Sequence, residues 1–318
     1  MRTFTIVFSC MNILFTMLPF SRSKAWWIRI FDFPRLQIDI LAILSIILLI
    51  IFPGDFSLDY TLVTLLVACF IYQSRHVVRF TPFFRVETPR VRNPKFSFSI
   101  LQTNVRMENR KVDKLKKHIR KYEPDIISVN EPDDWWADQL KELDEIYPYS
   151  IKKPLDNTYG MMVYSKYKFV NEEVNFLVKE GIPSIYATVS LPDGKEFDLH
   201  CVHPEPPAPG SPTYERDTEI LLIGKRVKES DRPAVIVGDL NDVAWSYTSL
   251  RFKKFSGVYD PRQGRGLFAT YNAFVPLFQY PLDHFFHTKD FALRKLKKLR
   301  KFGSDHYPMF ISLSFRDK

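Results

Sequence analysis

The sequence contains little cysteine, only 3 residues in 318. Cys10 and Cys69 lie within apolar segments and Cys201 stands alone, so the spacing indicates neither a disulfide framework nor a cysteine site for structural zinc. Internal repeats and low-complexity tracts are also absent from the sequence. The length exceeds the ~100 to 200 residues of a usual single domain. We therefore expect one large domain together with an additional segment.

Charge is almost absent from three segments near the N-terminus, at residues 3–20, 36–52 and 56–72. Each is close to the lower end of the ~17 to 25 apolar residues that cross a bilayer as a helix. Core helices of a soluble protein are the alternative interpretation. Three such runs close together, with Trp26 and Trp27 placed like an interfacial belt, favour an anchor of two or three transmembrane helices. The first segment either spans the membrane or lies flat in the interface.

Lysine and arginine residues orient this anchor. Residues 21–35 carry four of them and residues 75–92 carry five, whereas the link at residues 53–55 carries none. The positive-inside rule therefore predicts a cytoplasmic position for both basic stretches and for the main domain. In the competing hypothesis, residues 3–20 are a cleaved signal peptide and the domain is exported, but the basic loop would then have to be translocated.

We divide the chain into an anchor at 1–75, a basic juxtamembrane linker at 76–93 and a main domain at 94–318. Runs of strand length and composition predict strands at 96–103, 125–129, 159–164, 185–191, 196–202, 234–238, 282–287 and 308–315. Helical spacing predicts helices near 109–122, 134–146, 213–229 and 246–254. These strands are about as many as a double sheet needs, which indicates an α+β domain with one core. The proline-rich residues 203–212 are expected to form a rigid loop.

A strongly basic run lies at residues 294–301, where six of eight residues are cationic. A solvated face kept soluble by charge is the usual explanation for such a run. The alternative is a positive flank that favours an anionic substrate, because the run ends shortly before Asp305 and His306.

Polar residues collect where the predicted strands end, so loops can bring them together. They are Asn104, Asn130, Glu131, His203, Asp239, Asn241, Asp305 and His306, whereas Asp283 lies inside the predicted strand 282–287. Each residue alone has an ordinary explanation as a turn former, a helix cap or a satisfied histidine. Together they supply hard oxygen ligands suited to Mg²⁺, and imidazoles beside them.

In this order the motifs resemble the endonuclease/exonuclease/phosphatase superfamily, and the apolar N-terminus resembles its membrane-anchored bacterial members. The motifs are QTNV at 102–105, NEP at 130–132, HPEPP at 203–207, GDLND at 238–242, LDHFF at 282–286 and GSDHYP at 303–308. The resemblance implies a DNase I-like, four-layer α/β/β/α sandwich that follows two or three transmembrane helices. It also implies an integral protein of the inner (cytoplasmic) membrane.

The resemblance implies a site for Mg²⁺ or Mn²⁺. Glu131 is its best ligand, and Asp305 or Asn104 completes the coordination together with water. Asp239 is the candidate to align or deprotonate the attacking water. The sequence leaves open whether one or two metal ions bind.

The remaining site residues are implied to act on the phosphate. His306 lies over the scissile phosphate, as a base or as an electrophilic partner, and Asp283 orients its imidazole. Asn241 and Asn104 donate hydrogen bonds to non-bridging oxygens, and His203 stabilises developing charge. Tyr271 stands where relatives often place an aromatic that contacts the substrate, and a buried core tyrosine is the alternative.

These features predict a membrane-anchored, metal-dependent hydrolase of phosphate esters. The alternative is a catalytically silent scaffold of the same fold on the same anchor. The expected partners are the lipid bilayer and a phosphate-ester substrate, either nucleic acid or a phospholipid or inositol phosphate headgroup, as a monoester or a diester. No protein partner is inferred.

Overall fold

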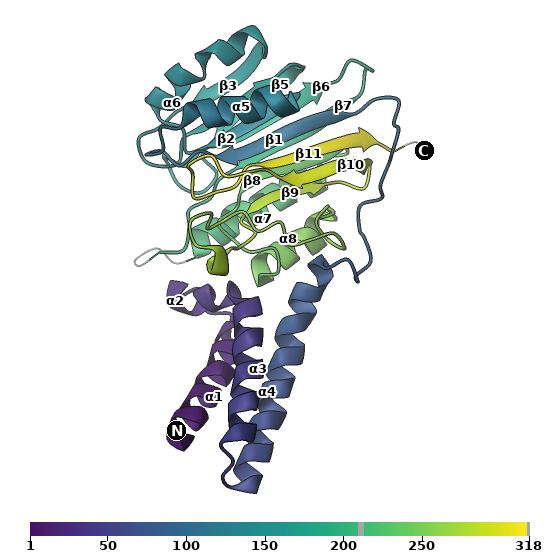
Figure 1. Ribbon diagram of the computed structural model, residues 1–318. Coiled ribbons are helices and arrows are strands. Elements are labelled where there is room, and N and C mark those ends of the chain that lie inside the picture. The colour runs from purple at the N-terminus through teal and green to yellow at the C-terminus, as the bar shows by residue number, and fades with distance from the viewer. Residues whose placement is uncertain (209–212, 317–318) are drawn as a thin grey trace.

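A computed structural model of the chain describes residues 1–208 and 213–316. A helical bundle formed by the N-terminal residues stands at one end of the molecule, and two stacked β-sheets with flanking helices form the other end (Figure 1).

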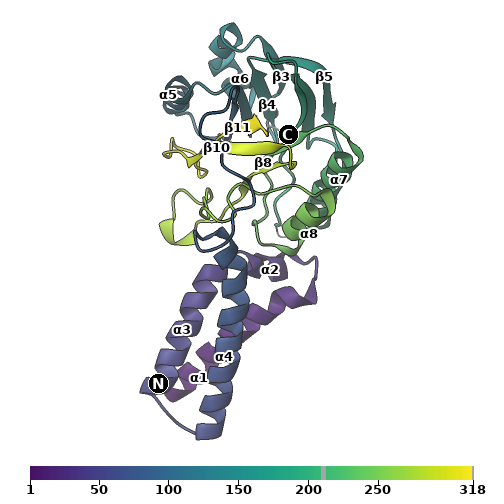
Figure 2. The same cartoon turned by 90° about the vertical axis from the view of Figure 1, so that its right-hand side faces the viewer.

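The bundle consists of three long helices that pack along one another (Figure 2). The N-terminal elements are α1 (Arg2–Met17), η1 (Leu18–Ser21), α2 (Trp26–Arg29), η2 (Ile30–Asp32), α3 (Arg35–Ile51), α4 (Phe56–Val77) and η3 (Val78–Phe80). Arg2 closes the far end of the bundle, where it forms an ion pair with Asp59 and donates to the Phe52 carbonyl at 3.0 Å. The helix α1 therefore runs along α3 and α4 and does not lie across their ends.

Two of these helical stretches are long and apolar enough to cross a membrane, Arg2–Ser21 and Phe56–Phe80. A third span is possible if the pair Trp26–Asp32 and Arg35–Ile51, bent by 76°, is counted as one. Many large apolar side chains of these helices are exposed on the outside of the bundle. A contiguous apolar surface of this kind is unfavourable in water. Such patches mark contact with a membrane or with a partner.

The first sheet has six strands in the order β10-β11-β1-β2-β4-β3. Their bounds are β1 (Phe98–Asn104), β2 (Ile126–Asn130), β3 (Tyr149–Lys153), β4 (Met161–Ser165), β10 (Phe291–Lys298) and β11 (Met309–Phe315). The strands β1 and β2 are parallel, whereas all other neighbours are antiparallel. The outer face is covered by α5 (Val112–Tyr122), α6 (Asp134–Gln139) and η4 (Lys141–Glu145).

The second sheet has five strands in the order β5-β6-β7-β8-β9. Their bounds are β5 (Lys168–Asn175), β6 (Ser184–Ser190), β7 (Glu196–Val202), β8 (Ala234–Asp239) and β9 (Asp283–His287). Here β7 and β8 form the parallel pair. The helices α7 (Tyr214–Glu229) and α8 (Tyr247–Ser256) pack on the outer face, and η5 (Pro276–Phe278) precedes β9.

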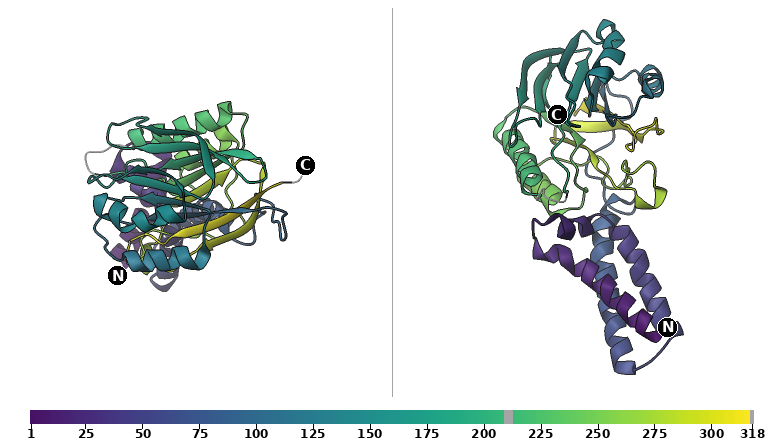
Figure 3. Two further views of the ribbon diagram at one scale, coloured as in Figure 1. Left: turned by 90° about the horizontal axis from the view of Figure 1, so that it is seen from above. Right: turned by 90° about the vertical axis from the view of Figure 1, so that its left-hand side faces the viewer.

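The two sheets pack face to face around the largest apolar core, so the layers follow the order α/β/β/α (Figure 3). Cys201 is buried in this core, while its neighbour His200 points to the opposite face of β7 and packs against Tyr186. This alternation follows from the two-residue period of a strand. The predicted DNase I-like sandwich is confirmed.

Residues 76–93, expected as a linker, pack against the sandwich. Phe80 is buried beside Trp245, and the Thr88 hydroxyl lies 2.8 Å from Nε2 of His287. Lys253 pairs with Glu87 at 2.6 Å. The connection from the bundle is therefore fastened to the sandwich. The boundaries of the three predicted segments remain a prediction.

The basic run at 294–301 coincides largely with β10, an edge strand of the first sheet. Arg294, Lys295 and Lys297 are exposed there, while Leu293 is buried against the core. Charged side chains on an edge strand prevent pairing with another chain. This agrees with the interpretation of the run as a solvated face.

Candidate active site

The two parallel strand pairs bring the polar residues together. Because β1 and β2 run in the same direction, Asn104 and Glu131 follow their ends at one edge of the first sheet. In the second sheet, His203 follows β7 and Asp239 ends β8 in the same way. The sheets face each other, since β1 and β2 both contact β8. Ligand sites of α/β folds commonly form at such carboxyl ends.

A cleft of about 720 Å³ opens at this point. Its polar lining consists of Glu131, Thr158, Tyr159, His203, Asp239, Asn241, Tyr271, Asp305 and His306. Six of the eight predicted catalytic and metal residues line this cleft. The two others, Asn104 and Asp283, lie directly behind its wall, where they contact Glu131 and His306 respectively. No predicted site residue lies on a separate face of the molecule.

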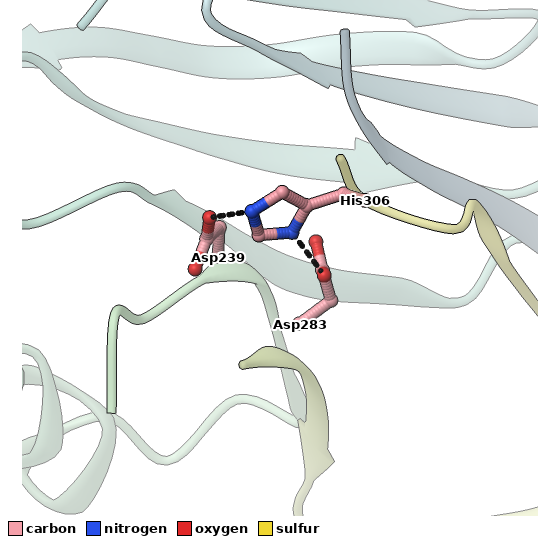
Figure 4. Close-up of side chains that lie close together, drawn as sticks. All are labelled: Asp239, Asp283 and His306. Carbon is pink, nitrogen blue, oxygen red and sulfur yellow. Dashed lines mark hydrogen bonds and ion pairs between the residues drawn. The ribbon is translucent and has the colours of Figure 1, made fainter. Parts of the chain in front are cut away.

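The imidazole of His306 lies between two buried carboxylates (Figure 4). Its Nδ1 atom is 2.8 Å from Oδ2 of Asp283, and its Nε2 atom is 3.4 Å from Oδ2 of Asp239. Both ring nitrogens therefore face an acceptor, and only the doubly protonated imidazolium can donate to both. The ring is also covered by Tyr271, whose centroid lies 5.0 Å away.

These carboxylates set the protonation of the histidine. Burial lowers the pKa of His306, but the negative charges of Asp239 and Asp283 outweigh it and raise the pKa to about 10. Burial in turn raises the pKa of Asp239, but the neighbouring His306 and His203 outweigh that effect and hold the pKa below its ordinary value. The pair is therefore an imidazolium beside a carboxylate at neutral pH.

Asn104 connects the two carboxylates of the site. Its Nδ2 atom lies 2.7 Å from Oε1 of Glu131 and 3.1 Å from Oδ2 of Asp239, and its Oδ1 atom accepts from the backbone N–H of Arg106 at 2.9 Å. The amide is 1% exposed. Asn104 is thus placed to hold Glu131 and Asp239 in position from behind.

His203 stands against the same two carboxylates from the other sheet. Its Nε2 atom is 3.8 Å from both Oε1 of Glu131 and Oδ2 of Asp239. Within the described residues its buried Nδ1 atom has no hydrogen-bond partner. The ring of Tyr159 lies 5.6 Å from the His203 ring and closes that side of the cleft.

Two site residues adopt left-handed backbone conformations, which are unusual for residues other than glycine. They are Glu131 with φ 62° and Asn241 with φ 50°. The backbone N–H of Asn241 donates to Oδ1 of Asp239 at 3.0 Å, and its side-chain amide donates to the Pro204 carbonyl at 2.9 Å. Such strain clusters at functional sites, where surrounding contacts maintain it.

The donor set fits a hard divalent cation. Glu131 and Asp305 both present carboxylates to the cleft, and the Asp305 side chain accepts only a 3.3 Å contact from the Ser304 hydroxyl among the described interactions. Burial raises the pKa of Glu131 despite its contact with His203, which means that a carboxylate there lacks compensating positive charge. Asp239, Asp283 and His306 also offer ligand atoms within 4.8 Å of one another. Because both nitrogens of His306 already face carboxylates, the oxygen donors are the better ligands.

Two other histidines are structural. His284 is buried; its Nδ1 atom accepts from the Arg262 guanidinium at 2.7 Å, and its Nε2–H donates to the Asp242 carbonyl at 2.8 Å. Burial lowers the pKa of His200 to about 4 and of His284 to about 3. Neither lines the cleft.

The sequence alone did not indicate the other wall of the cleft. This wall is apolar and comes from the N-terminal segment, through Trp26, Ile30, Phe31, Phe33 and Pro34, together with Phe278, Tyr280 and Leu282 of the sandwich. The helix α2 lies between the bundle and the sandwich (Figure 2). No local pattern places residues 26–34 against a site some 200 residues away, so this contact has no sequence signal.

The described lining of the cleft lacks the long cationic side chains. Of the described residues that line it, none is lysine or arginine, and none belongs to the basic run 294–301. The run therefore contributes no lining residue to the cleft, and its role as a positive flank stays an alternative interpretation. Arg294, Lys295 and Lys297 are exposed along β10 at the edge of the sheet, whereas Lys298 is half-buried and donates to the Ala269 carbonyl at 2.9 Å.

Residues 101–306 match the sequence model of the Endonuclease/Exonuclease/phosphatase family. Among curated proteins, none matches the sequence of the chain. Several solved structures share the fold, at identities that show similarity of fold alone.

One similar structure is TDP2 of D. rerio complexed with a single-strand DNA product, with 18% identity, a TM-score of 0.56, and coverage of 69% of this chain and 99% of that chain. Another is the human Nocturnin catalytic domain with bound sulfate, with 17% identity, a TM-score of 0.58, and coverage of 74% and 100%. A third is a mannosyl-6-phosphatase of Bacteroides thetaiotaomicron, with 16% identity, a TM-score of 0.52, and coverage of 69% and 100%.

Proposed function

Because the chain belongs to the endonuclease/exonuclease/phosphatase family, we propose that it hydrolyses phosphate esters in this cleft. The observation that carries the proposal is the position of His306 between Asp239 and Asp283, with Glu131 opening onto the same cleft. A charged imidazole and an array of carboxylates, all fixed before the substrate arrives, suit a reaction that depends on positioning and charge neutralisation.

Asp239 is proposed to accept a proton from the attacking water. Its carboxylate lies 3.4 Å from His306, whose positive charge keeps it ionised. His306 then acts as an electrophilic partner that donates from Nε2 to a phosphate oxygen, because its Nδ1–H is held by Asp283. In this role Asp283 is a positioning residue.

His203 and Asn241 are proposed to contact the remaining phosphate oxygens. Both line the cleft on the side of the second sheet, opposite Glu131. Donors fixed in a site of low dielectric stabilise the charge that develops in the transition state. Asn104 orients Glu131 and Asp239 from behind.

Mg²⁺ or Mn²⁺ is proposed as the cofactor, which would be held by Glu131 together with Asp305 or Asn104. When bound, the ion would neutralise phosphate charge and lower the pKa of water. The carboxylates Glu131 and Asp305 are the side chains of this cleft that would bind it.

The bundle is proposed to anchor the enzyme in the inner membrane, with the sandwich in the cytoplasm. Both basic stretches lie at the bundle end that meets the sandwich, whereas Arg2 and the link at 53–55 lie at the opposite end. This agrees with three spans and with the positive-inside rule. The catalytic domain at 94–318 would then work at the membrane surface; residues 209–212 and 317–318 of it lie outside the described residues.

The test uses the full-length chain in detergent with Mg²⁺ or Mn²⁺. The panel contains plasmid DNA, single strands, RNA, bis-4-nitrophenyl phosphate, 4-nitrophenyl phosphate, phospholipids and inositol phosphates. We expect turnover that a chelator abolishes and that Asp239→Asn removes. Asp138→Asn, at an exposed carboxylate on α6, is the matched control and should keep full activity. A folded protein that is silent on the whole panel would favour the scaffold alternative.

A further inference from the structure

We propose that the substrate of this cleft is a membrane lipid phosphate ester, with its phosphate at His306 and its apolar chain along the wall formed by residues 26–34. The inference rests on the proposed function, whose substrate class it names. It starts from the composition of the cleft. One wall carries the charged groups, and the facing wall carries Trp26, Ile30 and Phe31. A substrate that complements both walls has a phosphate at one end and an apolar group at the other.

The apolar wall is a built part of the fold. The Trp245 indole donates to the Asp32 carbonyl at 2.7 Å, and the ring of Phe33 meets that of Tyr280 edge to face at 5.5 Å. The side chain of Asp32 is buried between two arginines, at 3.1 Å from Arg29 and 2.7 Å from Arg35. These contacts hold α2 and η2 against the sandwich, so the wall keeps one position relative to His306.

A second apolar element stands at the rim of the same cleft. Residues 274–278 have the sequence FVPLF, and all five are exposed, with Leu277 at 79% and Phe278 at 51%. The side-chain amide of Gln37, at the start of α3, donates to the Leu277 carbonyl at 2.7 Å. This apolar loop therefore lies beside the top of the bundle, and Phe278 extends it into the cleft.

The position of both apolar elements favours a lipid over other occupants. Residues 26–34 lead directly into α3, whose outward side chains are apolar and exposed. A chain that leaves the cleft along this wall therefore reaches the surface of the proposed anchor helices. A nucleic acid would instead need cationic groups to neutralise successive phosphates, and the described lining has no lysine or arginine.

The experiment measures how kcat/KM depends on chain length for the full-length protein in lipid nanodiscs. The diester probes are methyl, butyl and octyl 4-nitrophenyl phosphate, and the monoester probes are butyl and octyl phosphate with detection of released phosphate. A buried methylene contributes up to about fourfold, so partial burial of an octyl chain predicts a preference for octyl over methyl of about 100-fold.

The variants separate binding by the wall from partition into the nanodisc. Ile30→Ser and Phe278→Ser alter half-exposed residues, each at 51%, and should reduce the octyl-to-methyl ratio by about tenfold. Ile146→Ser, at a residue 58% exposed and remote from the cleft, is the matched control and should keep the wild-type ratio. Partition is the same for every variant, so equal ratios in all of them would overturn the inference.

The remaining outcomes also decide between the proposals. Turnover without a chain-length preference keeps the proposed function and overturns the lipid inference, as does a preference for DNA or RNA. Dimerisation that Ile30→Ser abolishes, without such a preference, assigns the wall to a second copy. If no ester is turned over, the proposed function fails, and binding of methyl- and octylphosphonate still tests the wall. If octylphosphonate binds ten times more tightly than methylphosphonate and Ile30→Ser abolishes this difference, the apolar wall binds the chain. Equal binding of the two phosphonates contradicts the inference.

Discussion

Replacement of Asp283 by asparagine tests the charge arrangement around His306. The Asp283 carboxylate lies 2.8 Å from Nδ1 of His306. At an effective dielectric constant of about 20, a charge pair at this distance is attracted by about 6 kcal/mol. Asparagine keeps a hydrogen bond and loses the charge, so we expect roughly 2 to 4 kcal/mol less transition-state stabilisation, or a fall in kcat of roughly 30- to 1,000-fold. KM should change little, because Asp283 does not line the cleft.

The pH profile of the same variant separates this effect from a loss of structure. The pKa of His306 is raised to about 10, so the proposed donor is protonated below that pH and lost above it. Without the Asp283 charge the pKa falls, and the alkaline limb of kcat should move to lower pH by about one to three units. The assay is turnover of bis-4-nitrophenyl phosphate from pH 6 to 10. An Asp283→Asn enzyme that is slower with an unmoved alkaline limb would refute the electrophilic role of His306.

Three further predictions concern stability and geometry. Asp32→Ala leaves two buried arginines unpaired and should lower the unfolding free energy in detergent by about 3 to 5 kcal/mol, whereas an unchanged melting temperature would show that this contact does not hold the anchor. Burial raises the pKa of Glu219 to about 7 from 4.5, so its contribution to stability is complete below pH 4.5 and lost as the pH rises through 7. Glu219→Gln should therefore raise the free energy of unfolding by about 2 to 3 kcal/mol at pH 8 and leave it unchanged at pH 4. An equal increase at both pH values would contradict this linkage. In Gly238→Ala, the new Cβ would stand 1.9 Å from the Val202 carbonyl oxygen, so displacement of Asp239 should reduce kcat by about 100-fold with the circular dichroism unchanged. Wild-type activity of Gly238→Ala would contradict the prediction, because catalysis would then tolerate a displaced Asp239.

The strands that the sequence predicts are those with apolar runs. All eight predicted strands occur, and so do the four predicted helices of the sandwich, although residues 134–146 form α6 and η4 in place of one helix. The three unpredicted strands, β3, β5 and β10, all lie at sheet edges. Edge strands carry charge on positions that central strands bury, so their apolar signal is weak. The strand β5, KFVNEEVN, shows this directly, since most of its residues are exposed.

The polar half of the site could be predicted because each residue follows a recognisable strand. The ends of parallel strands meet at one edge, so Asn104, Glu131, His203 and Asp239 converge once the sandwich forms. The apolar half could not be predicted in this way. The wall depends on how residues 26–34 dock on Trp245 and Tyr280, and a docking surface between distant segments leaves no periodic pattern. The sequence likewise does not indicate Tyr159 as a cleft residue, because it is only the first residue of the predicted strand 159–164.

The central claim is that the carboxylates of Glu131 and Asp305 hold a divalent cation beside the His306 imidazole, with room for a phosphate between them. An experimental structure of the full-length protein with Mn²⁺ and inorganic phosphate tests it most directly, since anomalous scattering locates the manganese. We expect the ion on the carboxylate of Glu131, and phosphate oxygens in hydrogen-bond contact with Nε2 of His306. Manganese and phosphate bound elsewhere on the protein, with this cleft containing only water, would contradict the account.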